Sequence, residues 1–132
     1  MIPNTAFLPL APEGSKAYSG TGAIRGAEGD MEMLTVSLFA RLEAKPGKEA
    51  EVAAFLDQGL EMANQETTTP VWFALRLGPT TFAIFDAFHD ETGRQNHLNG
   101  PIANALMTHA PNLLAAPPVI EKMDVIGAKL AK

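Results

Sequence analysis

Hydrophobic and polar positions divide the chain into a first part without a pattern and a second part with a regular one. Residues 1–32 are rich in Pro, Gly, Ser and Ala and show neither the period of a strand nor that of a helix. From Met33 onward, short apolar runs alternate with segments of helical spacing. We therefore expect an N-terminal extension over 1–32 and one folded domain over 33–132. Five apolar side chains could anchor the extension across the domain or a partner subunit: Ile2, Phe7, Leu8, Leu10 and Tyr18.

The first half of the domain is expected to form a strand followed by a helix. Residues 33–44, MLTVSLFARLEA, are rich in residues that favour strands and place apolar side chains on both faces, as in a strand covered on both sides. Residues 45–66 open with a Pro-Gly turn and then repeat apolar residues every three or four positions. The predicted apolar stripe of this helix is Val52, Phe55, Leu56, Leu60 and Met62 or Ala63.

The second half is expected to form a hairpin, an interrupted helix and a last strand. Residues 67–88 contain two apolar runs joined by Gly78-Pro79, which is a hairpin signal. Residues 90–114 have helical spacing that is interrupted at Gly100-Pro101, since proline suits the first turn of a new helix. Residues 119–130 are typical of a strand. The predicted stripe of the second helix is Ile102, Leu106 and Met107, with Ala103 and Ala110.

The element order β-α-β-β-α-β predicts an α+β domain with a ferredoxin-like arrangement. In that arrangement a four-stranded antiparallel sheet carries both helices on one face. The strands nevertheless have apolar residues on both sides, namely Trp72, Phe82, Ile84, Phe85 and Phe88. A second cover is therefore required, and we expect it to be the same face of another copy, in an isologous homodimer.

Composition and charge exclude several classes of function. The 132 residues are 46% hydrophobic and 19% charged, with a net charge of −5 and no clustered basic residues, which disfavours nucleic acid and anionic membrane surfaces as partners. No apolar run approaches the roughly 18 residues that a membrane span needs. The chain has no cysteine, so disulfides, thiolate metal sites and cysteine nucleophiles are excluded. We expect a cytoplasmic protein, because the N-terminus has no basic region typical of a signal peptide.

Two residues stand out as candidates for acid–base chemistry. The ordinary pKa of histidine allows His97 to take a proton near neutral pH. Asp86 shares a strand face with Phe82 and Phe88, where an unpaired carboxylate would be costly, so it needs a partner such as His97 or Arg94. The alternative is a purely structural ion pair between strand and helix.

Five further residues are candidates for binding a substrate, and a metal site is not expected. Trp72, Phe82 and Phe88 would form apolar walls, and Arg76 and Asn96 would supply polar contacts; core or interface packing is the alternative for the aromatic residues. His89, next to Asp90, reads as a junction residue in solvent. The eight-residue spacing from His89 to His97 does not match paired helix ligands, which argues against a metal.

Three segments resemble the antibiotic biosynthesis monooxygenase (ABM) family of dimeric α+β barrel proteins. The matching residues are Pro46-Gly47-Lys48 before the first helix, Asp86 and Phe88 at the end of the third strand, and Asp90, His97, Leu98 and Asn99 beyond it. The resemblance implies a pocket between the helices and the sheet in each subunit. It does not favour haem, because the positions used by the haem-degrading branch are Ala40, Phe88 and about Met107 here, and His109 is displaced by two residues.

The resemblance implies a monooxygenase that oxidises a small aromatic or quinol-like substrate with O₂ and needs no cofactor. In that reading His97 is the base and Asp86 orients it. Two alternatives remain: a non-redox isomerase or lyase that uses the same histidine, and a dimer that binds a ligand without catalysis.

Overall fold

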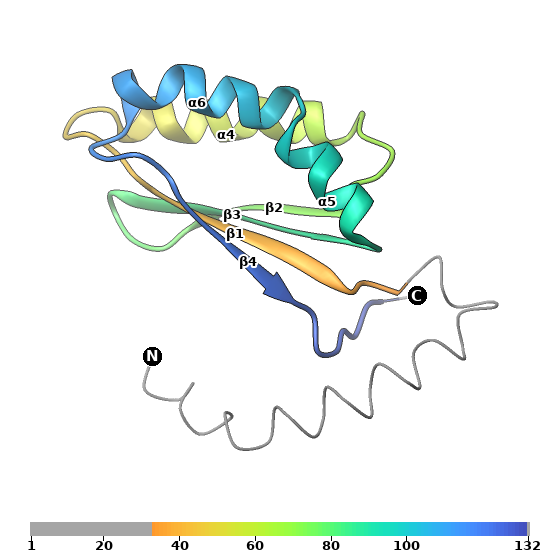
Figure 1. Cartoon of the computed structure of the whole chain (residues 1–132). Helices are drawn as coiled ribbons and strands as arrows, with labels where there is room; N and C mark the ends of the chain where they lie inside the picture. Colours follow the sequence, from red (N-terminus) through yellow and green to blue (C-terminus); the bar gives the residue numbers. More distant parts are fainter. Residues whose placement is uncertain (1–32, 132) are drawn as a thin grey trace.

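The computed structural model describes residues 33–131; the proposed extension and its anchoring residues lie outside the described residues. Four strands form one sheet in the order β2-β3-β1-β4, and every neighbouring pair is antiparallel. The strands are β1 (Val36–Glu43), β2 (Val71–Arg76), β3 (Thr81–Phe88) and β4 (Val119–Asp124). The helices are α4 (Glu49–Ala63), α5 (Glu91–Leu98) and α6 (Pro101–Leu113). The three helices of residues 33–131 lie on one side of the sheet, which confirms the ferredoxin-like arrangement (Figure 1).

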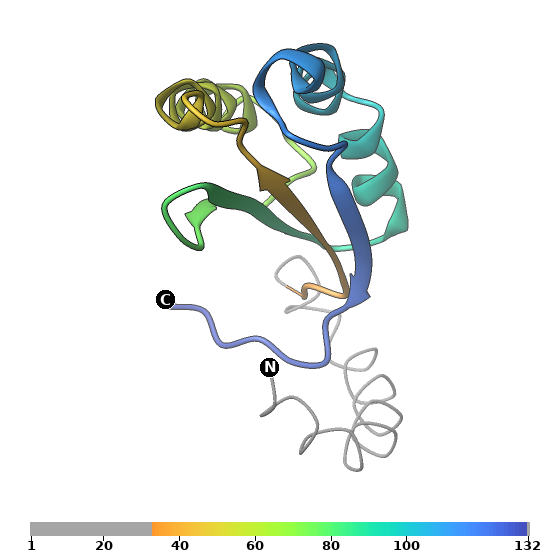
Figure 2. The ribbon, with the colours of Figure 1, turned by 90° about the vertical axis from the view of Figure 1, so that its left-hand side faces the viewer.

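The core lies between the sheet and the two longer helices. Strand alternation turns Leu42, Phe82 and Ile84 toward α4 and α6, where Leu56 and Leu106 pack against them. Figure 2 shows α4 and α6 side by side above the sheet, with α5 beside α6 at one edge. The buried faces of the helices are narrower than their sequence pattern predicted. Leu60 is 41% exposed and Met107 is 57% exposed.

The break between α5 and α6 follows from local chemistry. The side chain of Asp90 caps α5 by accepting a hydrogen bond from the backbone N–H of Gly93 at 2.9 Å. Asn99 ends α5, and Gly100 precedes Pro101, the first residue of α6, as the sequence predicted. This break lets α5 lie across the ends of β1 and β3 instead of continuing along α6. His97 is thereby brought over the sheet.

The sheet face opposite the helices has an apolar row at its centre, with Arg41 and Glu121 on the same face, and no helix of the described chain covers it. We call it the open face. One row of this face runs across three strands, because Phe73 pairs with Phe85 and Phe85 pairs with Phe39. The rings of Phe73 and Phe85 are stacked with centroids 6.3 Å apart, and Phe73 is 55% exposed. No helix in residues 33–131 is long and apolar enough to cross a membrane.

Candidate acid–base site

His97 lies between two carboxylates that come from different parts of the chain. Its Nδ1 atom is 2.9 Å from Oε1 of Glu66, in the loop after α4, and its Nε2 atom is 3.0 Å from Oδ2 of Asp86, on β3. The ring also packs against Phe88, with centroids 5.5 Å apart. His97 is 6% exposed and Asp86 is 2% exposed. The imidazole is therefore held on both polar edges in a largely dry environment.

The two contacts determine the protonation state of the ring. A neutral imidazole has one donor nitrogen, whereas two ionised carboxylates require two donors. Burial alone would lower the pKa of His97, but the hydrogen bonds and charges of Asp86 and Glu66 outweigh it and raise that pKa above its usual value. The ring can donate to both carboxylates only when both of its nitrogens are protonated, so this geometry favours the imidazolium.

Asp86 has one oxygen in use and one free. Oδ2 accepts from His97, while Oδ1 is buried and has no hydrogen-bond partner among the described residues. Burial raises the pKa of the Asp86 carboxyl above its usual value, and the hydrogen bond from His97 opposes this shift only in part. A carboxylate with a raised pKa and a free oxygen is a better base near neutral pH than an ordinary aspartate.

Glu66 was not predicted from the sequence. It lies in the polar segment ANQETTTP, which has no period and no motif that would single out one acid. The hydroxyl of Thr69 donates to its Oε1 at 2.6 Å, and this fixes the carboxylate that faces His97. The loop is also packed closely on α5: a Cβ on Gly93 would lie 2.9 Å from the backbone oxygen of Thr68. Only tertiary packing brings this loop to His97.

A small cavity adjoins the pair formed by Asp86 and His97. It has a volume of about 40 Å³ and lies between the sheet and helices α5 and α6. Apart from Asp86 and His97 its lining is apolar, and includes Leu38, Ile84 and Leu106. This volume accommodates a molecule of the size of water or O₂. A substrate with an aromatic ring requires the helices to move away from the sheet.

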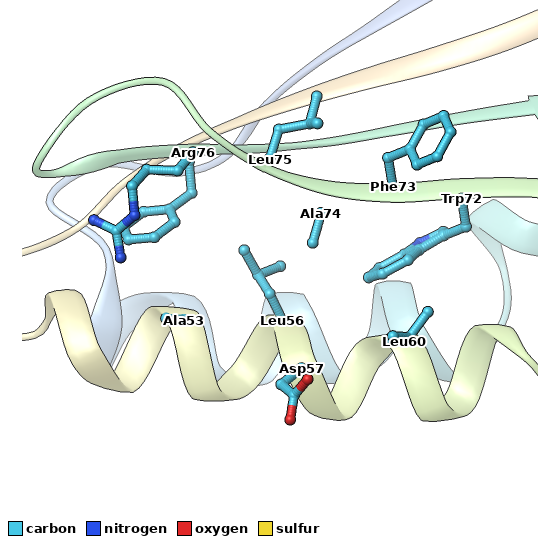
Figure 3. A pocket seen from close by; sticks show the side chains of 10 residues that line it. Ala53, Leu56, Asp57, Leu60, Trp72, Phe73, Ala74, Leu75 and Arg76 are labelled. Carbon is cyan, nitrogen blue, oxygen red and sulfur yellow. The ribbon is translucent and has the colours of Figure 1, made fainter.

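A second and larger hollow lies between α4 and β2 (Figure 3). This groove has a volume of about 380 Å³, and Trp72, Arg76 and Phe82 line it. It shares no lining residue with the cavity at His97. The sequence analysis assigned these three residues to the same substrate site as His97. The structure places them in a separate hollow.

The other predicted residues fall into different environments. Phe88 is fully buried against the His97 ring and lines neither hollow. Asn96, which was predicted to bind substrate, is exposed on α5, one position before the buried His97, and lines neither hollow. Arg94 does not pair with Asp86; its Nη1 donates to the backbone oxygen of Ser37 at 3.2 Å. His89 is a junction residue, with its Nδ1 2.6 Å from the backbone oxygen of Met33.

The three side chains of the site do not converge on a common point that could hold a metal. Glu66 and Asp86 contact opposite nitrogens of the same ring, so their bound oxygens lie on opposite sides of His97. No group of three or more metal-ligating side chains was found in residues 33–131. The arrangement is suited to holding and moving protons.

Comparison with solved structures places this domain among known folds. The NE2512 protein of Nitrosomonas europaea, a protein of unknown function, is 57% identical over 76% of this chain and 97% of its own, with a TM-score of 0.74. The chain belongs to the family of this Nitrosomonas protein. No model of a known protein family and no curated protein matches the sequence.

More distant structures identify the fold. A proposed antibiotic biosynthesis monooxygenase from Caulobacter crescentus is 20% identical, over 70% of this chain and 90% of its own, with a TM-score of 0.60. Another antibiotic biosynthesis monooxygenase is 15% identical, over 68% of this chain and 97% of its own, also with a TM-score of 0.60. The NE2512-like domain therefore has the ABM-like fold, as the sequence resemblance implied. At these identities the likeness concerns the fold alone.

Proposed function

We propose that this NE2512-like protein is an ABM-type monooxygenase that oxidises a small aromatic phenol or quinol with O₂. The observation that carries the proposal is the position of His97 between two carboxylates, one of which has a free buried oxygen beside an apolar cavity. Enzymes that abstract a proton near neutral pH need a base of this kind, with its pKa shifted by burial. The ABM-like fold supports the reaction class by analogy.

In the proposed reaction Asp86 takes the first proton. Its Oδ1 accepts the hydroxyl proton of the substrate, and the resulting anion transfers electrons to O₂. One oxygen atom becomes a carbonyl at a ring carbon, whose C–H bond breaks, and the other leaves as water with that proton and the hydroxyl proton. The substrate supplies all four electrons, so the balance requires no external reductant.

This assignment exchanges the roles that the sequence suggested for His97 and Asp86. Both ring nitrogens of His97 already contact carboxylates, so the imidazole has no free position to accept a proton from a substrate. As an imidazolium it stabilises the ionised form of Asp86 and holds a proton that can be returned to oxygen when water forms. Glu66 holds the ring in place from the opposite side.

Oxygen uptake with a panel of phenols tests the proposal. Anthrone and 1,4-dihydroxynaphthalene cover the two substrate types, and ¹⁸O₂ should place one labelled atom in the product. Asp86→Asn should lower the turnover number about 100-fold or more, while Glu61→Gln, the same change at an exposed position of α4, should leave it unchanged. Equal turnover by wild type and Asp86→Asn, or no oxygen uptake with either substrate type, would contradict the proposal.

A non-redox isomerase is the second candidate, because the site contains both a base and a proton donor. Asp86 can take a proton from one carbon of a substrate and His97 can supply the proton that returns. Such a reaction consumes no oxygen. Conversion of a keto–enol substrate at equal rates in air and under nitrogen would favour this candidate over the monooxygenase.

We also propose that the protein acts as a homodimer through the open face. The row Phe73, Phe85 and Phe39 is apolar across three strands, and Phe73 is more than half exposed. An exposed apolar surface on a sheet is a typical subunit interface. Two copies of the same row would cover each other in an isologous contact.

A further inference from the structure

The groove between α4 and β2 has the features of a binding site that is separate from His97. Every second residue of β2 faces the helices, namely Trp72, Ala74 and Arg76, so a small side chain lies between two large ones (Figure 3). At about 3.3 Å per strand residue, Trp72 and Arg76 start roughly 13 Å apart. Ala53 on α4 also lines the hollow and is small. These two alanines leave the space that the larger residues enclose.

The walls of the groove are apolar and one of them is aromatic. Leu56 and Leu60 of α4 form one side, and the indole of Trp72 lies at the end nearest to Leu60 (Figure 3). The indole reaches the helix because residue 59 is glycine: a Cβ there would lie 3.2 Å from the Cη2 atom of Trp72. Leu60, which the helical pattern assigned to the core, is 41% exposed here. A flat hydrophobic molecule would cover these surfaces.

The other end of the groove has a positive charge. The Arg76 guanidinium lies over the ring of Phe82, 4.5 Å from its centroid, and its Nη1 donates to the backbone oxygen of Pro79 at 3.3 Å. No carboxylate of the described residues forms an ion pair with it. The planar fork of an arginine suits a carboxylate, which can accept two parallel hydrogen bonds.

We infer that this groove binds a planar aromatic monocarboxylate, with the ring between Trp72 and Leu60 and the carboxylate on Arg76. A single arginine with Asp57 also lining the groove disfavours ligands of higher negative charge, such as phosphate esters. Because the groove shares no lining residue with the cavity at His97, the inference does not depend on the proposed oxygenase activity.

The single tryptophan of the chain provides a direct probe, since its indole N–H gives one signal in a ¹H–¹⁵N spectrum. We would titrate the full chain with 2-naphthoate, and in parallel with 2-naphthamide, which has the same ring and no charge. Binding of 2-naphthoate should shift the Trp72 indole signal with saturation. The dissociation constant for 2-naphthamide should be about tenfold higher or more, because a charged hydrogen-bond partner is lost.

Variants at position 76 distinguish the effect of the arginine charge on binding from an effect on folding. Arg76→Gln should raise the dissociation constant for 2-naphthoate at least about tenfold, and Arg76→Lys, which keeps the charge, should lose less. Lys48→Gln removes a positive charge from an exposed position outside the groove and should leave binding unchanged. Absence of a saturable shift, equal binding by wild type and Arg76→Gln, or tighter binding of 2-naphthyl phosphate than of 2-naphthoate would overturn the inference.

Discussion

The Nδ1 atom of His97 lies 2.9 Å from Oε1 of Glu66, a residue 31 positions earlier in a loop without any recognisable motif. This contact changes which residue of the pair formed by His97 and Asp86 can accept a proton from a substrate. With Asp86 alone, the ring could keep one nitrogen free for a substrate. With Glu66 on the opposite edge, both ring nitrogens face a carboxylate, and Oδ1 of Asp86 is the free oxygen at the residue that lines the cavity.

Removing His97 should destabilise the protein because it leaves two carboxylates without their shared partner. We expect His97→Leu to lower the free energy of unfolding by about 3–5 kcal/mol, as for other broken buried ion pairs. Adding Asp86→Leu should recover part of this loss, because the uncompensated buried charge on β3 is then removed. Urea unfolding of the two single variants and the double variant gives the coupling between the positions. A double variant less stable than His97→Leu would contradict the expected coupling.

Stability should fall as the pH rises above neutrality. The pKa of His97 is raised in the folded state, so its contribution is fully present below the ordinary histidine pKa of about 6.5 and is lost as the pH rises through the folded-state value. The raised pKa of Asp86 acts in the same direction above about pH 4. Urea unfolding between about pH 5 and pH 9 measures how the free energy of unfolding changes with pH. This range includes the ordinary histidine pKa. In His97→Gln the part of the decline above about pH 6.5 should disappear; an unchanged decline would assign it to other groups.

The loop that carries Glu66 should depend on the glycine that it packs against. A methyl group at position 93 would lie 2.9 Å from the backbone oxygen of Thr68, so Gly93→Ala should cost about 1–3 kcal/mol in spite of the higher helix propensity of alanine. The matched control is Gly127→Ala, where a Cβ meets no atom within 4 Å and the change should stay within about 0.5 kcal/mol. Thermal unfolding compares the two variants. Equal melting temperatures would show that the loop can move to accommodate the methyl group without a loss of stability.

A charge on the open face should separate the proposed dimer. Phe85→Glu places a carboxylate in the centre of the row formed by Phe73, Phe85 and Phe39, where a partner copy would have to bury it. We expect sedimentation analysis to show a dimer for the wild type and a monomer for this variant. Met107→Glu, on the exposed side of α6, serves as the control and should remain dimeric. A monomeric wild type would refute the proposed interface.

The fold could be predicted from the sequence to a large extent, because periodicity reports directly which way a side chain points. The two-residue alternation of β3 placed Asp86 and Phe88 on the helix side, and Gly100-Pro101 marked the break that brings His97 over that strand. Periodicity does not show how deeply a side chain is buried. Met107 and Leu60 have suitable spacing for a core, yet Met107 is exposed on α6 and Leu60 lines the open groove beside β2.

The site could be predicted only in part, for a related reason. Asp86 and His97 belong to regular elements, so their meeting follows from the fold. Glu66 belongs to a loop whose position depends on packing against α5 and on the hydrogen bond from Thr69. The separation of the cavity from the groove could not be predicted from the sequence either. Trp72 and Asp86 lie on the same face of the sheet and differ only in which helices cover them.

Titration of the His97 ring by ¹H–¹⁵N NMR, in wild type and in Glu66→Gln, tests most directly whether His97 is an imidazolium held by two carboxylates. We expect both ring nitrogens of the wild type to be protonated at neutral pH and the pKa of the ring to exceed its usual value. Glu66→Gln should lower this pKa, because a neutral amide replaces one of the two anions. A neutral His97 ring at pH 7 in the wild type, or the same pKa in both proteins, would contradict the claim.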